Sequence, residues 1–408
     1  MDMINLNSFL DFGYFLNYKN KDFHNLFDIA NIDRKKYENC NIDELISIGG
    51  KVFQRSIESL FNPNKKQCVP LSGGFDSRGI LAALLECTDA QNIYTFTFGV
   101  PGAYDYEIGN LIAKKVGTKH TSINLQNYHY TQKELEEISR RVDMQTVLFF
   151  TYPISIVDEI MHDKDNWSGA VVDTIFGGNY YQYNKFINTT FVEAAHNSFK
   201  DNTFIPNLKL ANISRDRYIK YVDYNQQVES YFNKGYIIDI LNRQVKYLIP
   251  HLYMKPFNYK HLVCSKELVS FAMSINQEYH RDRLFYIRML SSLYPYLFSL
   301  PIANNYGLPL DSPKWKNELI HSINYLRKKL GMLSKYTKYT DFNKEIRYNG
   351  YLQNVVKTNI NDLASRKIID WIDIRDILAN HINKKGNYAN ALLVLASLEI
   401  HLKNGREI

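Results

Sequence analysis

Between residues 67 and 178, short runs of apolar residues alternate with longer segments in which apolar residues recur at helical spacing. The short runs predict buried strands, and the longer segments predict amphipathic helices. Alternating strands and helices are typical of α/β domains built on a parallel sheet. The predicted strands are Cys68–Leu71, Ile93–Phe98, a short strand after Lys119-His120, and Trp167–Val172. The predicted helices are Arg78–Glu86, Tyr106–Val116, Gln132–Val142 and Tyr152–Met161.

The pattern changes on both sides of this region. Before residue 67, the clearest helix is Ile42–Leu60, whose apolar residues recur at roughly helical spacing. Residues 179–245 are polar and weakly periodic, and we interpret them as a partly helical cover or insertion. The remainder is predicted to be helical, with a strong final helix from Ala391 onward. We therefore divide the chain into a lead-in segment (1–66) and one domain (67–405), whose parts are 67–178, 179–245 and 246–405.

Composition indicates a globular protein. Of the 408 residues, 45% are hydrophobic and 22% are charged, which is an ordinary globular balance. No run of about 18 apolar residues occurs, so we expect no membrane span. The first residues lack the basic and apolar stretches of a signal peptide. The formal net charge of +7 is modest for this length, and we expect no nucleic-acid partner.

The cysteines narrow the expected compartment. None of the four belongs to a Cys-x-x-Cys pair, which argues against a zinc site or a disulfide framework. Scattered, unpaired cysteines fit a reducing environment, so we expect a cytoplasmic protein. The four positions are Cys40, Cys68, Cys87 and Cys264.

The segment that joins the first predicted strand to its helix carries the most chemical information. It reads Leu71-Ser72-Gly73-Gly74-Phe75-Asp76-Ser77-Arg78. A helix N-terminus presents unpaired N–H groups, so a glycine turn there can hold a polyphosphate on backbone donors. The two glycines have no Cβ to keep phosphates away, the two serines add hydroxyl donors, and Asp76 is an oxygen ligand suited to Mg²⁺. We predict a nucleotide site; the alternative interpretation is an ordinary Ser-Gly-Gly turn.

The Ser-Gly-Gly-x-Asp-Ser pattern resembles the signature of the PP-loop ATP pyrophosphatases. The rest of the chain resembles the synthetase domain of asparagine synthetase. The resemblance implies a PP-loop fold of the adenine nucleotide alpha hydrolase type, which is a doubly wound parallel sheet, followed by a largely helical C-terminal half. The segments that carry it, in the family's order, are Tyr94–Gly99, Asp105–His120, Ser168–Gly178, Lys255–Phe257, Leu300-Pro301 and Tyr306–Leu310.

The resemblance also implies a nucleotide and a metal. ATP would bind beyond the carboxyl ends of the strands, and pyrophosphate would leave while a substrate oxygen attacks the α phosphate. Two carboxylates beside a triphosphate require a cation between them, so Asp76 and Asp173 are the predicted Mg²⁺ ligands. With Arg78 they are the predicted catalytic residues, although Asp173 could instead be a helix N-cap. The predicted nucleotide-binding residues are Leu71, Ser72, Gly73, Gly74, Asp76, Ser77, Phe98, Gly99, Ser168, Gly169 and Asp173.

Three positions depart from the family pattern. The glutamate that serves as proton acceptor in the family's third segment is Ala170 here, and the acidic residue after the aspartate is Thr174. The lysine that stabilises charge in the family aligns with Ala303. These departures argue against asparagine synthesis by the usual chemistry. Candidate replacements for the charge and the base are Arg78, Lys255, His251, Asp143 and Glu107.

The N-terminus departs as well. Asparagine synthetases begin with a glutaminase domain whose nucleophile is a cysteine directly after the initiator methionine. Asp2 stands there in this chain, and residues 1–66 are too few for such a domain. We therefore expect no glutaminase half, and a separate protein or a free amine as the nitrogen donor.

Three functions follow from these observations. The leading hypothesis is an ATP-dependent, AMP-forming amide ligase acting on a small-molecule, sugar or peptide carboxylate, in surface-polysaccharide or natural-product biosynthesis. The second is a regulatory ATP-binding protein without catalysis, suggested by Ala170 and Ala303. The third is a PP-loop sulfurtransferase or tRNA-modifying enzyme, which the scattered cysteines and modest charge disfavour.

Overall fold

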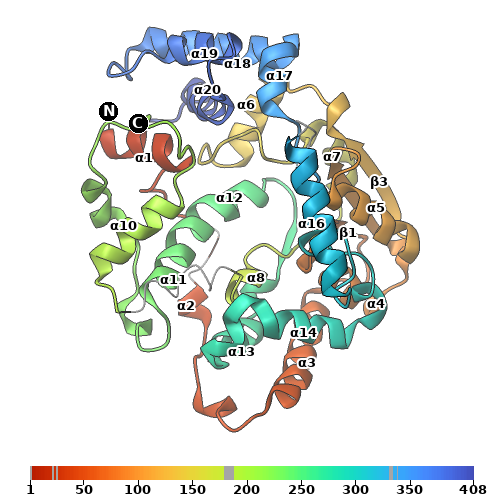
Figure 1. The fold of residues 1–408 in the computed structure, drawn as a ribbon. Helices are drawn as coiled ribbons and strands as arrows, with labels where there is room; N and C mark the ends of the chain where they lie inside the picture. The colour runs from red at the N-terminus through yellow and green to blue at the C-terminus, as the bar shows by residue number, and fades with distance from the viewer. Residues whose placement is uncertain (1, 21–22, 24–25, 179–187, 330–333, 338) are drawn as a thin grey trace.

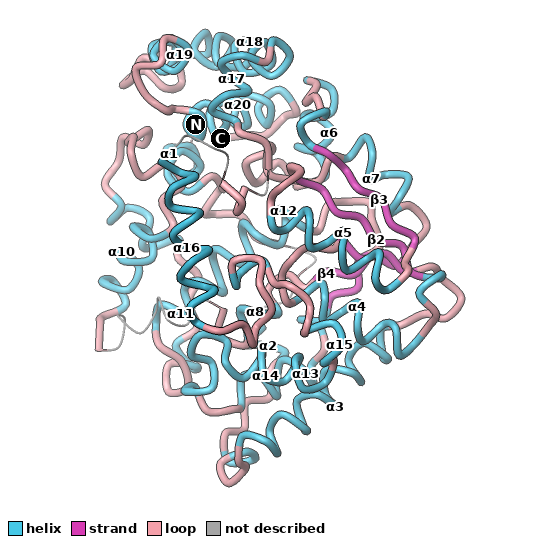
Figure 2. The backbone as a smooth tube through the Cα atoms, turned by 45° about the vertical axis from the view of Figure 1, so that its right-hand side comes forward, coloured by secondary structure: helices cyan, strands magenta, loops and turns pink. Residues whose placement is uncertain are grey.

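The computed structural model describes residues 2–20, 23, 26–178, 188–329, 334–337 and 339–408 (Figure 1). In this part of the chain five parallel strands form one sheet in the order β3-β2-β1-β4-β5. Figure 2 shows the sheet in magenta, with helices packed around it. The prediction of an α/β fold on a doubly wound parallel sheet is therefore confirmed. The strands are β1 (Gln67–Pro70), β2 (Ile93–Gly99), β3 (Lys119–Asn124), β4 (Asp165–Ser168) and β5 (Tyr259–His261).

Two strands differ from the prediction. β4 ends at Ser168, because Gly169 begins the turn into the short helix α8 (Val172–Ile175), and Val171 in that turn has a φ of 69°. β5 was not predicted, since its three residues contain no apolar run. It pairs with β4 in a region that the sequence pattern assigned to helices.

Apolar side chains fill both faces of the sheet. Neighbouring residues of β1 point to opposite faces, so Cys68 and Val69 belong to different buried clusters. On the Val69 face the cluster includes residues of α3 (Ile42–Leu60), α4 (Asp76–Cys87), α5 (Tyr104–Val116), α13 (Lys266–Ser274) and α14 (Leu284–Leu293). On the Cys68 face it includes residues of α1 (Met3–Phe12), α6 (Gln132–Arg141), α7 (Ile154–Met161), α18 (Gly350–Arg366) and α20 (Ala389–Lys403).

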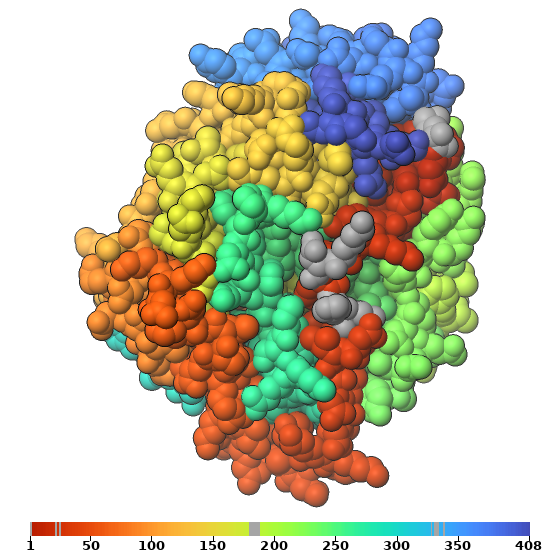
Figure 3. All heavy atoms as spheres, turned by 180° about the vertical axis from the view of Figure 1, so that it is seen from behind, coloured from red at the N-terminus to blue at the C-terminus, as the bar shows by residue number. Residues whose placement is uncertain are grey.

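The two ends of the chain lie against each other. The Phe9 ring of α1 meets the His401 ring of α20 edge-on at 5.5 Å. Viewed from behind, the N-terminal residues (red) lie beside the C-terminal helices (blue) and continue to the lower end of the molecule (Figure 3). There α3 begins with a capping box between Asn41 and Glu44. The proposed division of the chain into a lead-in segment and a domain remains a prediction.

The polar middle segment is partly helical where it is described. Residues 179–187 of the predicted insertion (179–245) lie outside the described residues. The described part forms α10 (Phe191–Asp201), a 3₁₀ segment (Arg215–Tyr221), α11 (Lys234–Ile238) and a π-helical segment (Asp239–Leu248).

The C-terminal part is mainly helical, as the sequence pattern predicts. No helix in the described ranges has the length and apolarity needed to cross a membrane. The remaining helices are α2 (Leu26–Ile29), α12 (Ile249–Leu252), α15 (Pro295–Phe298), α16 (Lys314–Lys329), α17 (Phe342–Tyr348) and α19 (Ile374–Ile382).

Candidate active site

The strand order creates a switch point between β1 and β4. From β1 the chain moves outward through β2 and β3 on one side, and later through β4 and β5 on the other. The connections after β1 and β4 therefore leave the sheet in opposite directions and open a crevice at the carboxyl ends of these strands. The loop after β1 carries Ser72–Ser77, and the turn after β4 carries Gly169–Asp173.

The Ser72–Ser77 loop is held by its own side chains and by two neighbouring segments. The Ser72 N–H donates to Ser77 Oγ (3.2 Å), and the Gly73 N–H donates to Asp105 Oδ1 (3.1 Å). A Cβ on Gly73 would lie 2.8 Å from the Cβ of Ala303 and 3.2 Å from that carboxylate oxygen. The loop leads into α4 at Asp76, so the free N–H groups of its first turn face the crevice.

The turn after β4 packs directly on this loop. A Cβ on Gly169 would lie 2.4 Å from the Cβ of Asp76, so the backbone of the turn contacts the first residue of α4. A Cβ on Gly178 would lie 2.6 Å from Asp173 Oδ2, so the backbone at Gly178 approaches that carboxylate closely. These close approaches bring the two predicted acidic residues into one crevice.

Asp76 and Asp173 form a partly buried, mutually repelling pair. Burial, together with the negative charge of Asp173, raises the pKa of the Asp76 carboxyl to about 8. Burial also raises the pKa of Asp173, against the opposing effect of Arg283. Two carboxyl groups that resist ionisation together fit a divalent cation, which would remove the repulsion and accept both as oxygen ligands. No group of three or more His, Cys, Asp or Glu side chains suited to a metal occurs among the described residues.

This electrostatic arrangement predicts a pH dependence. Because Asp76 binds a proton up to about pH 8, Mg²⁺-ATP must displace that proton, and affinity should rise as the pH approaches about 8 and then level off. Calorimetry in buffers of different ionisation enthalpy should detect proton release at neutral pH. Asp76→Asn should abolish the release. Binding without proton release in the unmodified protein would contradict the prediction.

Two residues of the crevice were missed by the sequence reasoning. The Tyr286 hydroxyl donates a hydrogen bond to Asp76 Oδ1 (2.8 Å). The Arg283 guanidinium lies 3.7 Å from Asp173 Oδ2 and 5.8 Å from the centre of the Phe75 ring. Arg283 adopts a φ of 59°, a conformation that non-glycine residues rarely occupy. Its only sequence signal is a basic stretch before an apolar helix, far along the chain from the loop.

Arg78 bonds through its guanidinium to backbone carbonyls of the protein. Its side chain is fully buried, and its guanidinium donates to the carbonyl oxygens of Leu297 (3.1 Å), Leu300 (3.2 Å) and Pro301 (2.6 Å). A longer bond reaches the Gly73 carbonyl (3.4 Å). Burial lowers the pKa of Arg78 to about 10. These contacts favour a structural role for Arg78, because its donors fasten α15 and the segment after it to α4. The role of Arg78 at the phosphates stays a prediction.

The other proposed replacements also have partners elsewhere. His251 is buried beside Thr146, and burial lowers its pKa to about 4, so it is a neutral core residue. Glu107 accepts a hydrogen bond from the backbone N–H of Gly102, in the turn before α5. Lys255 and Asp143 form an ion pair of 3.2 Å with each other. None of these contacts places a base beside the loop.

The positions that depart from the family serve packing. Ala303 is buried, and its N–H donates to the Gly73 carbonyl (3.0 Å). The Ala170 N–H donates to Ser168 Oγ (3.2 Å), which shapes the turn after β4. Of the other predicted nucleotide-binding residues, Leu71 is buried. Phe98 and Gly99 end β2, at the same edge of the sheet as the loop after β1. The predicted roles of these residues remain predictions.

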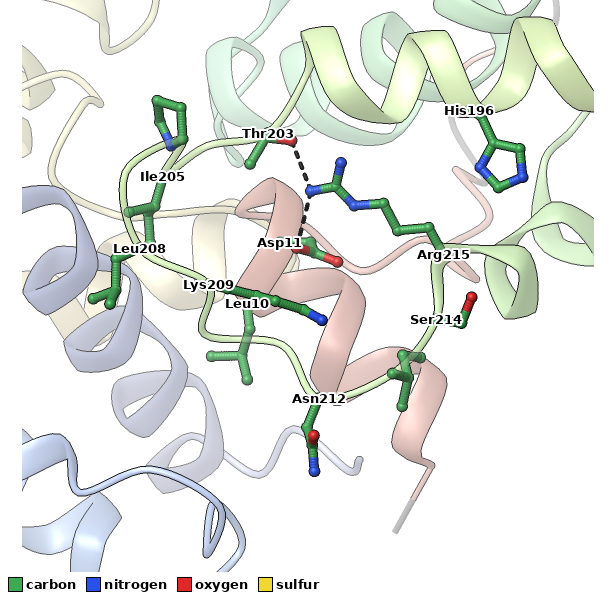
Figure 4. A pocket seen from close by; sticks show the side chains of 12 residues that line it. Leu10, Asp11, His196, Thr203, Ile205, Leu208, Lys209, Asn212, Ser214 and Arg215 are labelled. Atoms are coloured by element: carbon green, nitrogen blue, oxygen red, sulfur yellow. Dashed lines mark hydrogen bonds and ion pairs between the residues drawn. The ribbon is translucent and has the colours of Figure 1, made fainter.

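A separate cavity of about 760 Å³ lies between α1, α10 and the segment before residue 215. In its wall, Arg215 donates hydrogen bonds to Asp11 (3.3 Å) and Thr203 (2.8 Å), and Lys209 lies nearby (Figure 4). It shares no lining residue with the crevice at the switch point.

The chain was compared with known protein families and with curated proteins, and one family matches it. The family described as asparagine synthase matches residues 50–299, which is more than half of the chain. The match begins inside α3 and ends just after α15, so it includes the loop, the acidic pair, Tyr286 and Arg283. A search among curated proteins gave no match.

Proposed function

The chain belongs to the asparagine synthase family of ATP-dependent ligases, and from this premise we propose that it adenylates a substrate carboxylate and then forms an amide. The carboxylate oxygen attacks the α phosphate of ATP, and the bond to the β phosphate breaks to release pyrophosphate. An amine, or ammonia from a separate donor, then attacks the activated carbonyl carbon, AMP leaves with the bonding electrons, and the nitrogen loses a proton.

The observation that carries this proposal is the meeting of the phosphate-binding loop and the acidic pair at one switch point. The first turn of α4 offers backbone N–H donors to the β and γ phosphates, and Ser72 and Ser77 add hydroxyl groups. Asp76 and Asp173 would hold Mg²⁺, which supplies charge neutralisation at the departing pyrophosphate. The glycines at positions 73 and 169 allow the close backbone approach that this arrangement needs.

Arg283 is our candidate for the charge that Ala303 cannot supply. It is partly exposed within the crevice, and its contact with Asp173 holds it beside the expected phosphate position. A cation held by the acidic pair would compete with Arg283 for Asp173, and the guanidinium would then be able to turn toward the developing negative charge. Its αL backbone is a local strain of the kind that functional sites retain.

The substitution Arg283→Gln tests this role. We expect it to lower the maximal rate of ATP–pyrophosphate exchange by about a hundredfold, because one positive charge at the transition state is lost. Exchange assays at saturating Mg²⁺-ATP provide the measurement. The control is Arg288→Gln, which makes the same change on the exposed side of α14. An equal rate in the two variants would remove Arg283 from the mechanism.

Exchange of labelled pyrophosphate into ATP tests the function itself. The assay should be run with Mg²⁺ and a panel of amino acids, uronic acids and peptides. Exchange that depends on one carboxylate would establish adenylation and name the substrate class. The second candidate function, ATP binding without catalysis, is favoured by the alanines at 170 and 303. Tight ATP binding with no exchange and no AMP formation under any substrate and amine combination would support that candidate instead.

A further inference from the structure

Helix α16 presents its apolar side to solvent. Leu319, Ile323 and Leu326 lie four, eight and eleven positions after Trp315, which places all four residues on one face of the helix. The exposed fractions, from Trp315 to Leu326, are 60%, 52%, 42% and 58%. The described residues contain twelve exposed large hydrophobic residues, and five of them, including Tyr325, belong to this helix. Such a concentration is not the ordinary scatter of single apolar residues on a surface.

The opposite face of α16, which contacts the protein, is mainly polar, and the half-buried Ile320 lies at its edge. Asn317 donates from Nδ2 to Asn305 Oδ1 (3.2 Å), and Asn324 donates from Nδ2 to the Tyr104 hydroxyl (3.1 Å). These two asparagines are seven positions apart and lie half a turn away from the apolar stripe. A helix that stabilised only this fold would have the reverse orientation, with its apolar stripe on the core. The apolar stripe therefore needs another partner.

The charges on the helix indicate what that partner is. The segment Lys314–Lys329 contains five Lys or Arg residues and a single acidic residue, Glu318. Lys316 and Lys329 are exposed on either side of the stripe, stacked near the Trp315 and Tyr325 rings at 5.6 and 4.8 Å. Trp and Leu on one face with flanking lysines is the arrangement of helices that lie in a membrane interface rich in anionic lipids.

We propose that α16 docks this protein on an anionic membrane surface, with Trp315, Leu319, Ile323 and Leu326 inserted among the lipid headgroups. The helix would lie in the plane of the membrane rather than cross it. Asn317 bonds to Asn305, and Ala303 in the same short segment donates its N–H to the Gly73 carbonyl of the loop. Docking through α16 would therefore place the proposed nucleotide crevice close to the lipid surface. The proposal does not depend on which carboxylate is adenylated.

Vesicle binding by the full chain tests the proposal. Vesicles of phosphatidylcholine and phosphatidylglycerol in equal parts should sediment with the protein at low salt, whereas phosphatidylcholine alone should bind weakly. Leu319→Glu and Leu326→Glu should each weaken binding at least about tenfold, and Lys316→Glu by about fivefold. The matched control is Tyr351→Glu, which adds the same charge at another exposed side chain. Circular dichroism and ATP binding should show that each variant remains folded.

Tryptophan fluorescence gives a site-specific measurement. The chain has three tryptophans, and Trp315 is the one on the stripe, while Trp167 is fully buried. Emission should shift to shorter wavelength on anionic vesicles, and Trp315→Phe should remove the shift. No binding to anionic vesicles at low salt would overturn the proposal. If the glutamate variants instead dissociate an oligomer seen by light scattering, the partner is a second copy of the chain, and the membrane assignment fails.

Discussion

Replacing Asp76 with asparagine is expected to lower ATP–pyrophosphate exchange by about a thousandfold. The substitution keeps the size of the side chain and removes its charge. The introduced amide would no longer provide an anionic ligand to the cation, although its oxygen would still accept the hydrogen bond from Tyr286. The backbone donors of the loop are unchanged, so ATP binding without Mg²⁺ should be retained within about tenfold.

The comparison for this variant is Glu86→Gln, which neutralises an exposed carboxylate near the other end of α4. That variant should exchange pyrophosphate at the unmodified rate. If Asp76→Asn also stayed within about tenfold of the unmodified rate, Asp76 would not be a metal ligand. The repulsion between Asp76 and Asp173 would then need an explanation other than a cation.

Replacing Arg78 with methionine is expected to destabilise the protein by about 3 kcal/mol or more. The guanidinium satisfies the buried carbonyls of Leu297, Leu300 and Pro301, and methionine leaves these acceptors without donors. Urea denaturation followed by circular dichroism gives the free energy of unfolding. Since Gly73 also accepts from Arg78, some loss of exchange should accompany the loss of stability.

The control for stability is Arg55→Met, which breaks an exposed ion pair with Glu267 and should leave the free energy of unfolding nearly unchanged. The two possible roles of Arg78 give different results. A variant with unchanged stability and abolished exchange would support the prediction that Arg78 contacts the phosphates. A destabilised variant whose folded fraction still binds ATP would support the structural role.

The local sequence pattern predicted the helices and strands whose own residues show a clear apolar periodicity or apolar run. The helix Ile42–Leu60 was predicted with its observed bounds, and strands β1 and β2 were each predicted to within a residue at both ends. The loop after β1 could be recognised because strand, glycines, serines and Asp76 are consecutive. The crevice could not be completed in this way. Tyr286 and Arg283 reach it only because α14 packs on α3 and brings residues more than 200 positions away to the loop.

The orientation of the Arg78 side chain could not be predicted from local sequence either. A residue in the first turn of a helix can point toward the ligand or into the core, and the local sequence does not distinguish these directions. The carbonyls that accept its hydrogen bonds belong to Leu297 and the residues after it, which no local pattern connects with residue 78. The three residues of β5 were missed for a related reason, because a strand of that length is defined by its pairing with β4.

The packing around Gly73 restricts how this chain can change during evolution. A methyl group there would meet Ala303, Asp105 and Ile108 at 2.8, 3.2 and 3.3 Å, and these residues come from two separate segments. A substitution at 73 would therefore require the segment of Ala303 to move and α5 to yield by a few tenths of an ångström. A prior change that made this room would loosen the loop while glycine was still present. Mutational paths away from glycine thus pass through less fit intermediates, and the position is expected to persist even in descendants that acquire new substrates.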